Sequence, residues 1–184
     1  MVLVRETVID DWLALRDIRL EALRDAPNAF GSVYEQEVLR GEAHWRDRIA
    51  RGGTFLAYLP EVSATEPAGL IGGYQEDPVT VELVSMYVRP RARGRGVGEA
   101  LVATVIGWAR QRNAAAVHLW VTETNSHAYA LYERCGFALT GERQPLPSDP
   151  SIAEVAMARR LRPELRPDPH QPHRPAPGEP LERR

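Results

Sequence analysis

The sequence contains no lysine and a single cysteine. All 23 basic side chains among its 184 residues are arginine, so a catalytic lysine on this chain is excluded. Cys135 stands alone, which excludes an internal disulfide and a metal site of the CxxC type. His118 and His127 have no partner at metal-ligand spacing, and we expect no bound metal.

Long hydrophobic runs and an excess of one charge are also missing. The longest nearly apolar stretch, 100–109, is too short to cross a bilayer, and the first residues lack the pattern of a signal peptide. The net charge of −2 argues against a general attraction to nucleic acid or to an anionic membrane. We therefore expect a cytoplasmic protein with no nucleic-acid partner and no membrane partner.

The composition fits one globular domain followed by a tail. Apolar residues make up 43% and charged residues 26%, as in ordinary soluble proteins. From residue 162 the composition changes, since seven of the last 23 residues are proline and five arginines face four acidic residues. Such a segment buries too little apolar area to offset its ordering entropy. We predict a domain over 1–161 and a Pro/Arg-rich disordered tail over 162–184.

Hydrophobic periodicity predicts alternating helices and strands within the domain. Helices are expected after Asp10 or Asp11 up to Pro27, over 42–50, over 97–112 and over 126–135, the last of them capped by Gly136. The expected strands are 2–9, 54–59, 68–75, 79–88, 117–121, 137–143 and 153–160.

The most informative segment is a glycine-arginine turn, residues 93–98, between an apolar strand and an amphipathic helix. The first turn of a helix has unpaired N–H groups and the positive end of the dipole, so it favours an anion. Position 99 is Glu rather than Gly, which excludes the dinucleotide fingerprint, and no Gly-Lys-Ser/Thr is present for a P-loop. The turn predicts a phosphate site, with a flexible basic loop as the alternative.

With these residues in view, the chain resembles the GNAT acetyltransferase superfamily. The family signature (Arg or Gln, two residues, Gly, one residue, then Gly or Ala) matches 93–98. A second block matches at a suitable distance, through Asn125, a Leu-Tyr-Glu run containing Tyr132, and a Gly-Phe pair at 136–137. The motif match covers about 80–141, and the element order fits 1–161.

The resemblance implies an α/β (α+β) fold, with a mixed, mostly antiparallel sheet of six to seven strands splayed in the middle and about four flanking helices. It also implies acetyl-CoA as the acetyl donor. The pyrophosphate would lie on the turn and helix start, and the pantetheine arm would lie along a strand edge and an asparagine. The positions implied as binding acetyl-CoA are Met86, Tyr87, Val88, Arg93, Gly94, Arg95, Gly96, Val97, Gly98, Glu99 and Asn125.

Two residues are candidates for proton transfer. By the resemblance, Tyr132 would protonate the departing CoA thiolate, but a place in the core with a satisfied hydroxyl explains it as well. Glu82 precedes Arg93 by eleven residues, the spacing of a catalytic glutamate in the histone-type branch of the family, which suggests a general base. Its strand is apolar on both faces, so a buried ion pair with an arginine is the alternative.

The acceptor is expected to be an amine on a small molecule, with Phe30, Tyr34 and Trp45 available as apolar walls. A protein or peptide N-terminus and a non-catalytic acyl-CoA sensor remain alternatives. Bacterial enzymes of the family that acetylate protein N-termini often carry an acid five residues before the motif asparagine, where this chain has Trp120. A homodimer is left open.

Overall fold

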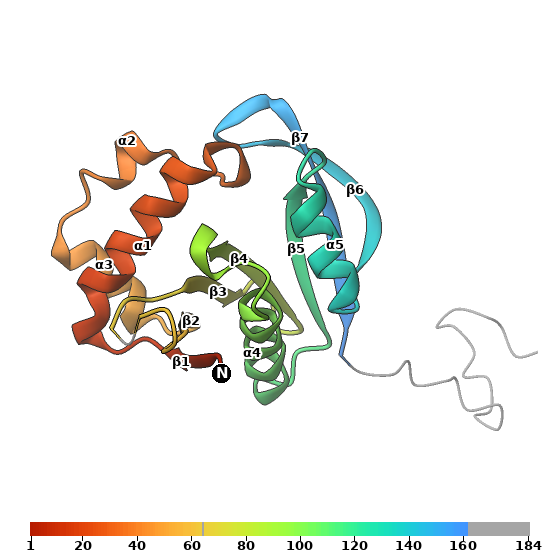
Figure 1. The fold of residues 1–184 in the computed structure, drawn as a ribbon. Helices are drawn as coiled ribbons and strands as arrows, with labels where there is room; N and C mark the ends of the chain where they lie inside the picture. The colour runs from red at the N-terminus through yellow and green to blue at the C-terminus, as the bar shows by residue number, and fades with distance from the viewer. Residues whose placement is uncertain (64, 162–184) are drawn as a thin grey trace, which may run out of the picture.

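A computed structural model describes residues 1–63 and 65–161, and the predicted tail (162–184) lies outside the described residues. Within them, seven strands form one sheet in the order β1-β2-β3-β4-β5-β7-β6 (Figure 1). The strands are β1 (Leu3–Glu6), β2 (Thr54–Tyr58), β3 (Gly69–Gln75), β4 (Thr80–Val88), β5 (Ala116–Thr122), β6 (Ala138–Leu146) and β7 (Asp149–Arg160).

Five α-helices flank the sheet in the described part of the chain. They are α1 (Trp12–Asp25), α2 (Tyr34–Glu37), α3 (Glu42–Ala50), α4 (Val97–Gln111) and α5 (Ser126–Arg134). Three short 3-10 turns join them, η1 (Ile9–Asp11), η2 (Pro27–Ala29) and η3 (Pro90–Ala92). None of the described helices is long and apolar enough to cross a membrane.

The sheet opens between β4 and β5. All neighbouring strands are antiparallel except this pair, which is parallel and joined only over residues 80–82 of β4 and 116–118 of β5. Beyond Glu82 the two strands separate, and β4 also carries a register shift and a left-handed residue, Ser85, with φ of 58°. A non-glycine residue is uncommon at positive φ, so this bend marks a special place in the strand.

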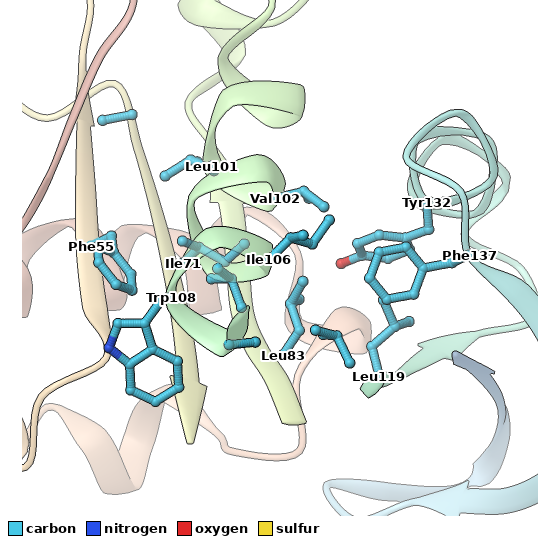
Figure 2. Close-up of a cluster of buried hydrophobic side chains, with 14 of the residues drawn as sticks. Phe55, Ile71, Leu83, Leu101, Val102, Ile106, Trp108, Leu119, Tyr132 and Phe137 are labelled. Atoms are coloured by element: carbon cyan, nitrogen blue, oxygen red, sulfur yellow. The ribbon is translucent and has the colours of Figure 1, made fainter. Parts of the chain in front are cut away.

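Two apolar clusters cover opposite faces of the sheet, because successive strand residues point to opposite sides. On one face α4 packs with strand residues such as Ile71 and Leu83 (Figure 2). On the other face α1 and α3 pack over Leu70 and Tyr87. Figure 1 shows the same division, with α1 and α3 together on one side and α4 apart from them.

The fold class predicted from the sequence is confirmed, including the splayed mixed sheet and the four longer helices. Gly136 has φ of 82°, the left-handed cap expected after α5. The one-turn helix α2 was not predicted, and β1 ends at Glu6, earlier than predicted, with η1 beginning three residues later. The last two strands are longer than expected and form a hairpin joined by 147–148.

Candidate active site

A cavity of about 770 Å³ lies where β4 and β5 separate. Its volume is in the range of ordinary small-molecule sites. It extends from the open end of β4 to the start of α4 and the first turns of α5, and the segment after α1 closes its far side. It is lined by Asp25, Ala26, Ala29, Phe30, Met86, Tyr87, Val88, Ala92, Arg93, Gly94, Gly96, Val97, Gly98, Glu99, Asn125, His127, Ala128, Ala130, Leu131 and Arg134.

The glycine turn is bent so that α4 begins at the cavity. Gly94 and Gly96 have φ of 71° and 77°, in the left-handed region that glycine tolerates best, and Gly96 caps α4. A Cβ at Gly98 would lie 3.0 Å from Cδ2 of Leu131, so glycine there lets α4 approach α5 closely. The turn therefore presents the unpaired N–H groups of a helix start to the cavity, as an anion site requires.

The two arginines of the turn, Arg93 and Arg95, do not both point into the cavity as phosphate ligands would. Nε of Arg93 donates to the carbonyl of Val88 at 3.0 Å, and Nη2 lies 2.6 Å from Oδ2 of Asp25. Arg93 therefore ties the turn to β4 and α1. Arg95 does not line the cavity. Where a phosphate was expected, the lining consists of the glycine turn, the helix start and Arg93, whose guanidinium is already bound to Val88 and Asp25.

The open edge of β4 supplies the opposite wall. Met86, Tyr87 and Val88 all line the cavity, beyond the point where pairing with β5 stops. Backbone N–H and C=O groups on this edge are available to an extended ligand, as on any unpaired strand edge. The Tyr87 hydroxyl donates to Glu21 at 3.4 Å, and burial raises the pKa of that hydroxyl.

Asn125 and Glu99 both line the cavity, yet each also has a structural partner. Oδ1 of Asn125 accepts from the Ala128 N–H at 3.1 Å, so the residue caps α5. Glu99 accepts from Arg134 at 2.9 Å, which links α4 to α5, and this hydrogen bond lowers the pKa of Glu99. Asn125 therefore fixes the start of α5, and the pair of Glu99 with Arg134 holds α4 and α5 together beside the cavity.

Tyr132 is buried between α5 and α4 and is not among the cavity-lining residues. Its ring centroid lies 5.8 Å from that of Phe137, and Figure 2 shows both rings turned toward the α4 side of the core. Burial raises the pKa of the hydroxyl, so it keeps its proton at neutral pH. The same state suits a proton donor and a packed core tyrosine.

Glu82 pairs with a histidine. Its carboxylate is 5% exposed and lies 2.7 Å from Nδ1 of His118, whose Nε2 is 3.6 Å from Glu142. Burial raises the pKa of Glu82, and the hydrogen bond from His118 opposes that rise. Sequence spacing gave no indication that His118 would contact Glu82. The parallel register that places Glu82 opposite His118 arises only when β4 and β5 pair.

Glu76 joins this pair. One ligand atom each from Glu76, Glu82 and His118 lies within 4.8 Å of the others, a separation compatible with metal ligation. Exposed acidic groups are common without a metal, and Glu76 is exposed. The absence of a metal therefore stays a prediction.

Of the three aromatic residues suggested as acceptor walls, Phe30 lines the cavity. Trp45 is fully buried in the core beneath α1, and Tyr34 lies under the guanidinium of Arg24 at 4.5 Å. The hairpin between β6 and β7 reaches across to this side, where the Ser148 hydroxyl donates to the Phe30 carbonyl at 2.6 Å (Figure 1). The hairpin therefore braces the part of the cavity wall that contains Phe30.

A cavity between a splayed strand pair and a glycine-capped helix start also agrees with what the sequence matches. The profile described as the acetyltransferase (GNAT) family matches residues 12–137. The chain belongs to this family. The matched region contains α1 to α5 and every residue that lines the cavity.

Curated GNAT relatives include mycothiol acetyltransferases. The protein of Salinispora arenicola is 39% identical over 138 residues, and that of Salinispora tropica is 34% identical over the same length. Each alignment covers 70% of this chain and 41% of the relative, so the chain spans about two fifths of the length of these relatives. Among solved structures, the Salmonella typhimurium protein yncA, determined with its cofactor acetyl-CoA, has a TM-score of 0.69 at 18% identity and covers 92% of this chain and 99% of that one. This likeness shows the fold.

The residues present fit the acetyl donor of the GNAT family. The glycine turn leaves open space where any Cβ at Gly94 or Gly96 would stand, so a phosphate can approach the backbone there. The open edge of β4 lies on the same cavity and leaves room for an extended arm between β4 and α5.

Proposed function

We propose that the chain is an N-acetyltransferase that moves the acetyl group of acetyl-CoA directly to an amine of a small molecule. The observation that carries this proposal is that one continuous cavity extends from the open edge of β4 to the start of α4. Such a shape accommodates a long donor with phosphates at one end and a reactive thioester at the other.

The donor is proposed to lie along that cavity. N–H groups of residues 94–99 would bind the pyrophosphate, since the helix start combines free donors with a positive dipole end. Backbone groups of Met86 to Val88 would pair with the pantetheine arm and polarise the thioester carbonyl, and Asn125 would contact the arm from α5. Arg93 is proposed to act indirectly, by holding the turn in place.

The chemistry requires an uncharged amine. An alkyl ammonium with a pKa of about 10.4 costs roughly 4.6 kcal/mol to deprotonate at pH 7. We assign Glu82 as the base, acting directly or through water, because burial raises its pKa above that of an exposed carboxylate and His118 orients it. The freed amine forms the C–N bond, the C–S bond breaks, and the thiolate takes a proton that we assign to Tyr132.

A small-molecule acceptor is supported by the curated relatives, which are named mycothiol acetyltransferases. The chain spans only 41% of their length, so their acceptor is not transferred to this protein. Electrostatics of the sheet face agree with a cationic amine. The charges of Glu76 and Glu154 act on Glu82 there, and burial raises the pKa of both Glu82 and Glu154.

The test is release of free CoA thiol from acetyl-CoA in the presence of pooled amines, namely amino acids, polyamines, aminoglycosides and short peptides. We expect pool-dependent release, and splitting the active pool identifies the acceptor class. Acetyl-CoA binding is measured separately by calorimetry. Tight binding with no release from any pool would contradict the proposal and favour an acyl-CoA sensor.

A further inference from the structure

Two arginines lie under the helices near Phe30, Arg19 buried and Arg48 partly buried. Arg19 of α1 is only 4% exposed, and burial lowers its pKa to about 10 with a further contribution from the charge of Arg48. Arg48 of α3 has its pKa lowered chiefly by burial as well. Buried charges in proteins are normally paired, because the cost of removing them from water is large.

These two guanidinium groups lack the expected pairing. Nε and Nη1 of Arg19 are buried and have no hydrogen-bond partner among the described residues. Nη2 of Arg48 donates to the neutral hydroxyl of Ser85 at 2.9 Å. Glu37 attracts both arginines, yet neither forms an ion pair within 4.0 Å in the described ranges, and Oε2 of Glu37 is itself buried without a hydrogen bond. The cluster therefore contains positively charged hydrogen-bond donors without an acceptor among the described residues.

Neither arginine is among the cavity-lining residues, but each is linked to one that is. The guanidinium of Arg19 lies over the ring of Phe30, 4.8 Å from its centroid, and Phe30 lines the cavity. Ser85, the partner of Arg48, directly precedes the cavity residue Met86 and has φ of 58° at the bend of β4. The bend thus places a hydroxyl and an arginine next to the strand edge that is proposed to hold the thioester.

We propose that Arg19 and Arg48 form a carboxylate subsite, so that the acceptor is an amine that also carries a carboxylate. A guanidinium matches a carboxylate in geometry, and hydrogen bonds between charged groups are about twice as strong as neutral ones. Arg19, Arg48 and Glu37 together carry one net positive charge, and Arg51 adds a further positive charge near Arg48, so the cluster favours an anionic group. This inference rests on the proposed acetyl transfer to a small molecule and narrows its acceptor class.

The first experiment compares matched acceptors. Active amino acids or short peptides are assayed against their C-terminal amides, which differ only in the carboxylate, with acetyl-CoA and thiol release as the readout. We expect kcat/KM to be at least about tenfold higher for the acids, the range of a hydrogen bond to a charged group. Equal kcat/KM for acids and amides would overturn the subsite while leaving the acetyl transfer intact.

A carboxylate could also arrive on the acyl donor. The same amide acceptors are therefore assayed with succinyl-CoA, whose acyl chain ends in a carboxylate. The proposed subsite for the acceptor carboxylate would be overturned by two results together: a higher kcat/KM with succinyl-CoA than with acetyl-CoA, and equal kcat/KM for acid and amide acceptors. A preference for acids with acetyl-CoA as the better donor supports it.

Variants assign the effect to the two arginines. In Arg48→Gln the amide can still donate to Ser85, and we expect the acid preference to fall to less than about threefold with KM rising more than kcat falls. Arg46→Gln is the matched control on the same helix, because Arg46 is partly exposed and pairs with Glu42 at i,i+4. Arg19→Met is a second variant that removes the buried charge and keeps an apolar stem. Preference unchanged in both Arg48→Gln and Arg19→Met would contradict the proposal.

A binding experiment separates this inference from the proposed reaction. The full-length chain is titrated by calorimetry with a pool of N-acetylated amino acids and with a pool of their amides. We expect binding of the acids that is lost in Arg48→Gln and retained in Arg46→Gln, whether or not turnover is seen. Binding of acids without turnover would refute the acetyl transfer alone. Equal binding of both pools, or of neither, would refute the subsite.

Discussion

Substitution of Tyr132 by phenylalanine separates the two roles that its position allows. The ring stays, and so does its contact with Phe137 at 5.8 Å between centroids. Only the hydroxyl is lost, and burial holds its pKa above the usual range, so it carries a proton at any working pH. A change in turnover would then report the proton itself rather than the packing.

The magnitudes of the two effects are well separated. A positioned general acid contributes about 10²- to 10⁴-fold, which corresponds to roughly 2.7 to 5.4 kcal/mol in the barrier. Loss of one hydroxyl from a packed site changes the free energy of unfolding by about 1 kcal/mol or less. We therefore expect kcat for Tyr132→Phe to fall by at least about a hundredfold while the unfolding midpoint hardly moves.

The assay is steady-state thiol release with acetyl-CoA and the active amine, with acetyl-CoA affinity measured by calorimetry. Tyr129→Phe is the matched control, because Tyr129 lies on the same helix and is also outside the cavity lining. Because Tyr132 does not line the cavity, a purely structural role would leave turnover unchanged in Tyr132→Phe. Turnover within about threefold of wild type, with normal acetyl-CoA binding, would remove Tyr132 from the mechanism.

Three further changes test the base, the phosphate turn and the sheet. For Glu82→Gln we expect loss of the rise in kcat/KM with pH, measured over pH 5.5 to 9. A carboxyl whose pKa is raised in the folded state makes the protein less stable as pH rises through that pKa. The variant, which lacks this carboxyl, should therefore be no less stable than wild type at pH 7 in urea denaturation. Gly96→Ala should weaken acetyl-CoA binding in calorimetry and lower the free energy of unfolding by about 1 kcal/mol, because φ at this residue is 77°. Gly53→Ala should cost more than about 2 kcal/mol in thermal unfolding, since φ is 73° and a Cβ would lie 2.2 Å from the Gly73 carbonyl oxygen, whereas Gly107→Ala, inside α4 with open space, should stabilise by about 0.5 to 1 kcal/mol. Wild-type stability in Gly53→Ala would contradict the packing described around β2 and β3.

The sequence predicted the local structure around the proposed acetyl-CoA site, because the signals there are local. The glycine turn follows a strand directly, and its helix has an apolar stripe that continues to Trp108. Asn125 begins α5 as its cap, and Gly136 ends the helix. Each feature is decided by neighbours within a few residues, so periodicity and capping rules suffice.

The acceptor end was less visible, because its contacts join distant parts of the chain. Asp25 meets Arg93 across 68 residues, and Glu82 meets His118 across 36, through a parallel register that no local pattern encodes. Arg19 did leave a signal. It lies on α1 between the buried positions Ile18 and Ala22, where helical periodicity predicts an apolar side chain. A charge on a buried stripe indicates either a partner or a ligand.

The pKa values of Arg19 in the proposed carboxylate subsite and of Glu82, the proposed base, are shifted in opposite directions. Burial lowers the pKa of Arg19 and raises that of Glu82, so each group is held against its charged form. A bound carboxylate would raise the first pKa, and a bound ammonium would lower the second. Arg19 stays protonated at pH 7 either way, whereas an arriving ammonium favours the ionised form of Glu82. Acceptor binding near the raised pKa of Glu82 should therefore release protons, and the calorimetric enthalpy should depend on the ionisation enthalpy of the buffer.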